Sequence, residues 1–178
     1  SGAMDPLIIM GGATDVRVLG CEVIAADRAV AEALEIAPGE PVQRAVRVRR
    51  IAEGPFSYLM THVPAWAADF DADDLADAPM LALLERAGLR PSSAKQEMSV
   101  TLADAVVAEH LAVDVGAPLM RVRRVVRDQT DRAIELIEAL YRCDRYRMTM
   151  SLTRAVAGET GADGNSWGAV WRSEEGQE

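Results

Sequence analysis

The sequence is poor in aromatic residues, histidine and cysteine, and each scarcity narrows what the chain can be. Aromatic side chains make up 4% of the 178 residues, so the core must be built from aliphatic side chains and alanine. The two histidines, His62 and His110, are isolated and no CxxC or HxxxH spacing occurs, which argues against a metal site. The two cysteines, Cys21 and Cys143, lie far apart, as expected for reduced thiols rather than a disulfide framework.

Positive charge and long apolar runs are also lacking. The formal net charge of −9 is opposite to that of a typical nucleic-acid-binding domain. No apolar run is long enough to cross a bilayer and no signal peptide is visible, so we expect a cytoplasmic protein. Nucleophile elbows, Walker loops and dinucleotide fingerprints are absent, and we expect no cofactor. What is present, 49% hydrophobic and 26% charged residues, is typical of a soluble globular domain.

Composition divides the chain into four segments. Residues 1–6, SGAMDP, look like a remnant of protease cleavage and cloning, and residues 7–15 read as a linker. Residues 16–154 are predicted to form the folded domain. Residues 155–178 are Gly-rich and polar, which is typical of a tail, and Trp167 and Trp171 are the side chains that could anchor it.

One stretch of the sequence occurs twice. ADRAVAEALEIAPGEPV begins at Ala26 and ADAVVAEHLAVDVGAPL at Ala103, and nearly half of their positions are identical. Each copy has an Asp at a helix N-cap position, an apolar stripe at helical spacing and a Gly-x-Pro entry into a strand. Each first strand leads through a turn into a second one, FSYLMTHVP or AIELIEALYR.

The duplication predicts an α+β fold with a mostly antiparallel sheet, built from two helix–strand–strand repeats with the helices covering one side. We expect the offset between the copies to hold through the hairpin, so that Tyr58 corresponds to Glu135 and Pro64 to Tyr141. Between the copies, residues 69–77 are acidic and turn-like, and Pro79 precedes a Leu-rich helix.

The stretch VRVRR carries the strongest indication of binding chemistry. In a strand, Arg47 and Arg49 point to one face while Val46 and Val48 point to the other. Two guanidinium groups at this spacing can hold a carboxylate or a phosphate, although a solvated strand face is the plainer interpretation. The arginines of the second copy are expected to pair with surface carboxylates: Arg121, Arg123, Arg124 and Arg127.

The last predicted strand contributes a further carboxylate. Alternation places Glu135 and Tyr141 on one face of this strand, and Leu136, Glu138 and Leu140 on the other. Glu135 could bind a ligand hydroxyl or amine, pair with an arginine or face water. The segment Asp144-Arg145-Tyr146 reads as structural rather than catalytic, because no nucleophile or acid–base pair is next to it.

The order APGEPVQRAVRVRR, GPFSYLMTHVP, Leu-rich helix, GAPLMRVRRVV and IELIEALYRCDRYRM closely resembles the UTRA effector domain of HutC-subfamily GntR-type bacterial transcription regulators. The resemblance covers roughly Val16 to Arg154. It implies a chorismate-lyase-like fold and a non-catalytic, homodimeric ligand sensor, as in repressors of this family. It also implies a DNA-binding winged helix-turn-helix domain that this chain does not include.

The resemblance also implies which residues bind the effector. Arg47 and Arg49 match the family's Arg-x-Arg pair for an anionic group, and Glu135 and Tyr141 match its ligand-binding Glu and Tyr. Leu59 stands where relatives often carry an acidic residue, so a hydroxyl of a bound sugar would lose a partner there, at a cost of about 1–3 kcal/mol. We therefore expect an anionic effector, carboxylate or phosphate, with an apolar or aromatic body.

Two other functions are compatible with the sequence. A chorismate-lyase-like enzyme would use the arginine pair to hold a dicarboxylate, but nothing at catalytic spacing supports it beyond the fold. A pure dimerisation module would have a closed, apolar-filled cleft in place of a ligand site.

Overall fold

The computed structural model describes residues 15–68, 70–146, 151–154 and 167–170. The chain divides into two compact units, and the larger one, Ala13–Tyr146, contains the doubled sequence. The elements of this unit are β1 (Asp15–Ala25), α1 (Arg28–Leu34), β2 (Pro41–Ile51), β3 (Gly54–Pro64), α2 (Ala72–Asp77), α3 (Met80–Arg86), β4 (Pro91–Leu102), α4 (Ala105–Leu111), β5 (Pro118–Asp128) and β6 (Ala133–Arg142).

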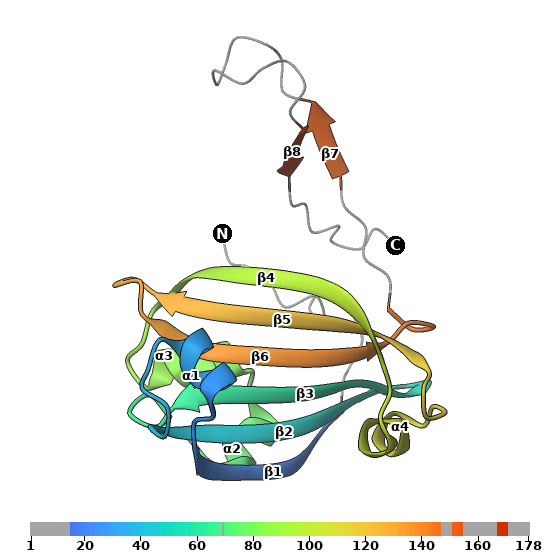
Figure 1. The fold of residues 1–178 in the computed structure, drawn as a ribbon, viewed down its shortest axis with the longest axis horizontal. Coiled ribbons are helices and arrows are strands. Elements are labelled where there is room, and N and C mark those ends of the chain that lie inside the picture. The colour runs from blue at the N-terminus through green and yellow to red at the C-terminus, as the bar shows by residue number, and fades with distance from the viewer. Residues whose placement is uncertain (1–14, 69, 147–150, 155–166, 171–178) are drawn as a thin grey trace. The chain divides into compact units, whose positions relative to one another are not determined.

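The strands of this unit form one antiparallel sheet in the order β1-β2-β3-β6-β5-β4 (Figure 1). The predicted α+β class and antiparallel sheet are confirmed. The two repeats meet at the centre, where β3 pairs with β6. The repeated unit is longer than predicted, because β1 and β4 occupy equivalent places at the two edges and each precedes a repeated helix.

The two repeated helices form for the reasons that the sequence gives. The carboxylates of Asp27 and Asp104 each accept a hydrogen bond of 2.8 Å from the backbone N–H three residues later, which caps the helix. The apolar stripe of α1 packs with Leu136 of β6, and that of α4 packs with Tyr58 of β3. Each repeat therefore buries its helix against the last strand of the other repeat.

The prediction that the repeat offset holds through the hairpin is wrong by one residue. Arg49 pairs with Ser57 in the first copy, and its counterpart Val126 pairs with Glu135 in the second. Ser57, not Tyr58, is therefore the counterpart of Glu135, and by the same shift Val63, not Pro64, is the counterpart of Tyr141. The physical reason is the longer turn of the second hairpin, residues 129–132 against residues 52–53.

Helices cover both faces of the sheet, so the expectation of helices on one side is also wrong. The helices α1 and α4 lie on one face, here called the α1/α4 face. The segment between the repeats covers part of the other, the α2/α3 face, where Leu75, Leu83 and Leu84 pack with Ala45, Val63 and Val126 (Figure 1). The repeated helices, α1 and α4, therefore cover only one of the two faces of the sheet.

The acidic segment predicted to be turn-like instead contains a helix. The Asp71 carboxylate accepts hydrogen bonds of 3.0 Å from the N–H groups of Asp73 and Asp74, and the Asp74 carboxylate accepts one from the Asp71 N–H. This reciprocal capping box holds α2 in place. The Gln43 side chain donates a 2.7 Å hydrogen bond to the Phe70 carbonyl and fastens the start of this segment to the sheet.

The smaller unit contains an antiparallel pair of strands, β7 (Ser151–Arg154) and β8 (Trp167–Val170). The polar, Gly-rich composition did not predict β8. Residues 1–6, residues 7–14 and Trp171 lie outside the described residues, and so does most of the predicted tail. None of the described helices has the length and apolar character that a bilayer-spanning segment needs.

Candidate functional site

The predicted site residues all map to the α2/α3 face of the sheet. Arg47 lies opposite Leu59, and Arg49 lies opposite Ser57. On the far side of β3, Leu59 lies opposite Ala139 and Ser57 lies opposite Tyr141. Residues directly opposite one another share a face. Arg47, Arg49, Leu59 and Tyr141 therefore occupy two neighbouring rows of one face.

Glu135 lies on the same face but farther along it. It is three rows from Tyr141 on β6, roughly 20 Å along the strand. Glu135 lies opposite Val126 of β5, which packs against α2 and α3. The structure thus groups the two arginines, Leu59 and Tyr141 closely, and places Glu135 at the covered end of the face.

The site is buried and polar. Arg47 is 2% exposed and Glu135 is fully buried, while Leu59 and Tyr141 are also buried and Arg49 is half-buried. The interpretation of VRVRR as a solvated strand face is therefore wrong for Arg47. A closed, apolar-filled cleft is not what this face presents either, because charged and hydroxyl-bearing side chains alternate with apolar ones.

Sequence reasoning missed three buried polar side chains on this face. Ser57 and Thr61 on β3 are 0% and 1% exposed, and Gln43 on β2 is 8% exposed. Within the part of the chain that the structure describes, the Ser57 and Thr61 hydroxyls and the Gln43 carbonyl oxygen have no hydrogen-bond partner. The alternation Ser57, Leu59, Thr61 in FSYLMTHVP was the signal that could have grouped the two hydroxyls with Leu59.

Cys21 of β1 lies opposite Ala45, and charges at the N-cap of α2 and on β2 act on its thiol. Burial raises the pKa of the Cys21 thiol, the Asp71 carboxylate raises it further, and the Arg47 guanidinium opposes them. Both charges therefore act at this point of the α2/α3 face, so the helix cap and the arginine share one neighbourhood. Both cysteines are free thiols, and among the described residues no group of three potential metal ligands occurs.

Tyr141 is held by an aromatic cluster. Its ring centroid lies 5.4 Å from that of Phe56 and 4.8 Å from that of Tyr146. The Arg145 guanidinium donates a 2.7 Å hydrogen bond to the Pro55 carbonyl, and Arg142 forms an ion pair with Asp144. The Asp144-Arg145-Tyr146 segment thus fastens the end of β6 to the β2–β3 hairpin, which is the structural role that the sequence predicts.

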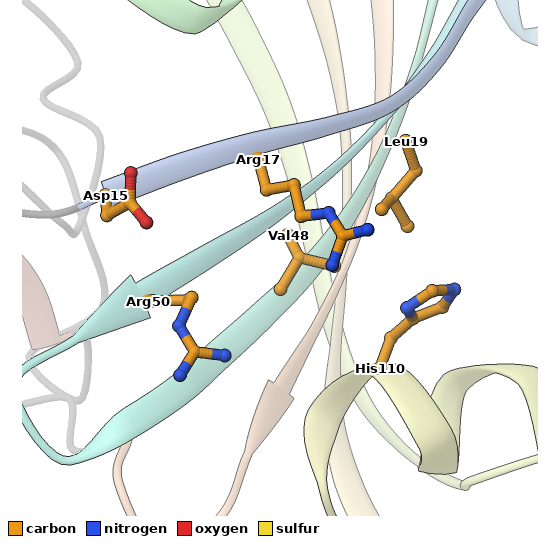
Figure 2. A pocket seen from close by; sticks show the side chains of 6 residues that line it. All are labelled: Asp15, Arg17, Leu19, Val48, Arg50 and His110. Carbon is orange, nitrogen blue, oxygen red and sulfur yellow. The ribbon is translucent and has the colours of Figure 1, made fainter.

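Two surface cavities lie away from these residues. One, of about 220 Å³, opens on the α1/α4 side near the start of β1 (Figure 2). Its lining is formed by Asp15, Arg17, Leu19, Val48, Arg50 and His110. The other lies around Gly88, Arg90 and Gln129. Neither cavity is lined by a residue of the predicted site.

The arginines of the second copy behave largely as predicted. Arg121 pairs with Glu138 at 2.7 Å, Arg123 with Glu97 at 3.9 Å, and Arg127 with Glu35. Arg124 differs, because it donates a 2.8 Å hydrogen bond to the Gln96 amide oxygen rather than to a carboxylate. Arg124 is the repeat counterpart of Arg47 and lies on the same face.

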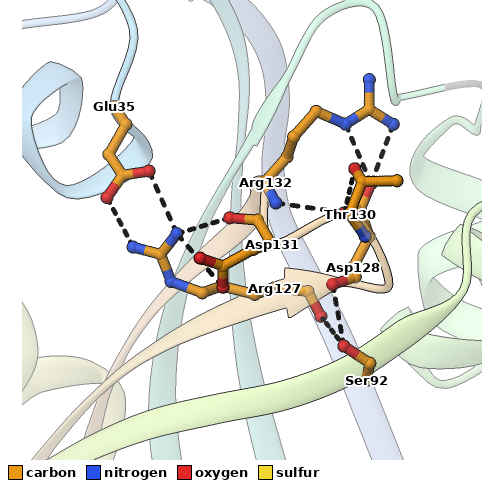
Figure 3. Close-up of polar contacts among 7 residues, drawn as sticks. All are labelled: Glu35, Ser92, Arg127, Asp128, Thr130, Asp131 and Arg132. Carbon is orange, nitrogen blue, oxygen red and sulfur yellow. Dashed lines mark hydrogen bonds and ion pairs between the residues drawn. The ribbon is translucent and has the colours of Figure 1, made fainter.

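A polar network closes the β5–β6 turn (Figure 3). The Asp128 carboxylate, which is 5% exposed, accepts hydrogen bonds from the Thr130 hydroxyl at 2.7 Å and from the Arg132 guanidinium at 2.8 Å. Burial alone would raise the pKa of this carboxyl, but the hydrogen bonds from Thr130 and Arg132 outweigh it and hold the pKa well below its ordinary value.

We predict that Asp128→Asn reduces the loss of folding stability that occurs when the pH is lowered. A carboxyl with a lowered folded-state pKa stabilises the fold above its unfolded-state pKa, and this contribution is lost as the pH falls from about 5 towards 2. The difference between the thermal midpoints at pH 7 and pH 3 should therefore be smaller in Asp128→Asn than in the wild type. The exposed Asp114→Asn should keep the wild-type difference, and an unchanged difference in Asp128→Asn would contradict the assignment.

Comparison with known proteins matches this chain to a UTRA domain model and to bacterial transcription regulators. The sequence model of the UTRA domain matches residues 10–147. The HTH-type transcriptional repressor NagR of Bacillus subtilis is 25% identical over 139 residues, which are 78% of this chain and 57% of the repressor. The chain thus spans little more than half the length of this curated relative.

Solved structures agree with the fold. A Streptomyces coelicolor protein described as a transcriptional regulator is 32% identical with a TM-score of 0.73, over 76% of this chain and 91% of that one. The ligand-binding domain of a GntR-family regulator from Bordetella bronchiseptica is 27% identical with a TM-score of 0.74, over 80% and 90% of the two chains.

Proposed function

Because this chain belongs to the UTRA domain family, we propose that it is the effector-binding part of a HutC-subfamily GntR-type transcription regulator. The effector is a small anion that Arg47 and Arg49 bind on the α2/α3 face. In the complete regulator, effector binding changes the DNA affinity of a winged helix-turn-helix domain. The domain works as a cytoplasmic homodimer and as a sensor rather than an enzyme.

The buried arginine pair is the observation that supports this proposal most strongly. Arg47 is 2% exposed in a chain whose net charge is −9, although solvation favours an arginine at the surface. Arg49 follows one row away, so two guanidinium groups are held on one face. An anion between them would gain charge-assisted hydrogen bonds in surroundings where water competes little.

Leu59 defines the body of the proposed effector. It is 4% exposed and lies opposite Arg47, with Ala139 next to it on β6. Apolar side chains beside the arginine pair favour a ligand whose anionic group is joined to an apolar body. An amino-sugar phosphate would place hydroxyls against Leu59 and leave them without a partner.

Coupling to DNA requires two states of the regulator that bind the effector differently. If the effector binds one state more tightly, it shifts the population towards that state. The factor by which it changes DNA affinity is then the factor by which DNA changes its own affinity. The chain enters the sheet through β1, whose residues Val16 and Val18 lie opposite Arg49 and Arg47. A change at the arginine pair therefore acts directly on the strand nearest to the proposed DNA-binding domain.

A thermal-shift series tests the proposed function. Binding to the folded state alone raises its stability by RT ln(1 + [L]/Kd), about 2.7 kcal/mol at a concentration one hundred times Kd. We expect carboxylates or phosphates with apolar bodies to raise the thermal midpoint in a concentration-dependent way, and their uncharged amides or alcohols to have no effect. Chorismate should not be turned over. Equal effects of charged and uncharged compounds, or turnover, would overturn the proposal.

A further inference from the structure

The unpartnered polar atoms of the α2/α3 face lie on both sides of Leu59. Ser57 and Thr61 precede and follow Leu59 on β3 by two residues each, so each hydroxyl is about 7 Å along the strand from the Leu59 row. Ser57 lies opposite Arg49 and Tyr141, at the end that holds the arginine pair. Thr61 lies opposite Ala45 and Ile137, at the end that α2 and α3 cover.

These hydroxyls cost the fold stability as they stand. A buried polar group without a hydrogen bond loses its hydration and gains nothing in return. Both hydroxyls are almost completely buried, and within the described residues neither has a partner. The sheet would lose no hydrogen bond if alanine and valine replaced them, so the fold itself does not account for their presence. A ligand that supplies the missing hydrogen bonds does account for it.

Gln43 shows which kind of group is missing near Thr61. Its amide nitrogen donates a hydrogen bond to the Phe70 carbonyl, and within the described residues its carbonyl oxygen is buried without a partner. Gln43 lies opposite Val63, diagonally adjacent to Thr61, within reach of a group placed between the two side chains. An amide oxygen can only accept a hydrogen bond, and a hydroxyl can accept one too. The group that satisfies both must therefore be a donor.

Resting on the proposed function, we infer that Ser57 and Thr61 contact the effector and that the effector has two polar ends. Its anionic end lies at the arginine pair, where the Ser57 hydroxyl donates to it. Its apolar body crosses Leu59, and a hydroxyl or amine at its far end donates to Thr61 and Gln43. This excludes simple fatty or aryl acids as the matching ligand and points to terminally hydroxylated or aminated acids.

Three carboxylates that differ only at the far end test the inference: hexanoate, 6-hydroxyhexanoate and 6-aminohexanoate. Calorimetry on the wild-type chain should show that the better of the two donors binds about tenfold more tightly than hexanoate, the value of one hydrogen bond in a closed site. Thr61→Val should remove this ratio, whereas Thr101→Val on the edge strand β4 should retain it. Ser57→Ala should weaken all three probes by a similar factor, because it acts on their common carboxylate.

Stability without ligand provides the second readout. Since no hydrogen bond is lost, Thr61→Val should raise the thermal midpoint by about 2–4 °C, and Ser57→Ala should not lower it. A lowered midpoint in Thr61→Val would show that the hydroxyl supports the fold, and would overturn the inference. Equal binding of all three probes, or a ratio retained in Thr61→Val, would do the same.

The outcomes separate this inference from the proposed function. If anions bind through Arg49 but the terminal donors bring no advantage, the two-ended effector is wrong and the sensor remains. If other anions bind and none of the three probes does, the proposed ligand class is wrong. If no anion stabilises the chain at all, both proposals fail.

Discussion

Arg49→Ala is expected to weaken binding of an anionic effector by about 10- to 100-fold, the value of a hydrogen bond to a charged group. The half-buried Arg49 is the better of the two arginines to remove, because Arg47 is 2% exposed and its loss would also disturb the packing around it. Arg47→Lys is the second variant, and it should also weaken binding. Lysine keeps the charge but cannot bind both oxygens of a carboxylate in a fixed fork. Calorimetry with any anion that stabilises the chain gives the measurement.

Two matched controls make this result specific. Arg124→Ala removes the repeat counterpart of Arg47 from the same face, where it is hydrogen-bonded to Gln96, and should leave affinity unchanged. Arg50→Ala removes a guanidinium from the cavity near the start of β1 and should also have no effect. Weaker binding in Arg50→Ala with normal binding in Arg49→Ala would move the anion to that cavity and refute the proposed site.

Phe56→Ala is expected to reduce the free energy of unfolding by about 3–5 kcal/mol. Phe56 is fully buried and its ring contacts both Tyr141 and Tyr146, so its removal leaves a cavity between β3 and the end of β6. It also occupies an irregular position, because the pairing of β2 with β3 skips it. A loss of this size is a large part of the stability of a typical domain.

The repeat provides the comparison for this prediction. Ile134 is the equivalent skipped residue of β6 and is also fully buried, so Ile134→Ala should cost about 2–5 kcal/mol. Phe56→Leu should recover most of the stability, since it restores much of the lost volume. Urea unfolding with linear extrapolation measures all three variants. A cost below about 1 kcal/mol for Phe56→Ala would mean that the aromatic cluster does not stabilise the end of β6.

Local patterns carried most of what the sequence could predict. Alternation placed Arg47, Arg49, Glu135 and Tyr141 on their faces, because a strand's period of two leaves no choice once its bounds are known. The Asp27 cap was equally readable, since capping depends on neighbours within three residues. Such features need no knowledge of the tertiary structure.

The failures have a different physical origin. The segment that forms α2 has only one apolar side chain larger than alanine, Leu75, and three aspartates, so no helical stripe marks it. Its capping box uses Asp74 in place of the usual Glu. The hydrogen bond from Gln43 to Phe70 joins residues 27 positions apart. Which face this segment covers, and hence which polar side chains become buried, is decided by tertiary contacts that periodicity does not encode.

The exchange of helices between the two repeats has a consequence for stoichiometry. Because α1 packs on β6 and α4 on β3, the chain has the arrangement of a two-fold symmetric pair of half-domains joined into one polypeptide. Such symmetry would offer two equivalent sites. Among the described residues, the segment that carries α2 and α3 has no counterpart in the second repeat, and the counterparts of Arg49 and Thr61 are Val126 and Ala139. A titration of this chain should therefore saturate at one effector per polypeptide, with no second, weaker event from the symmetry-related half.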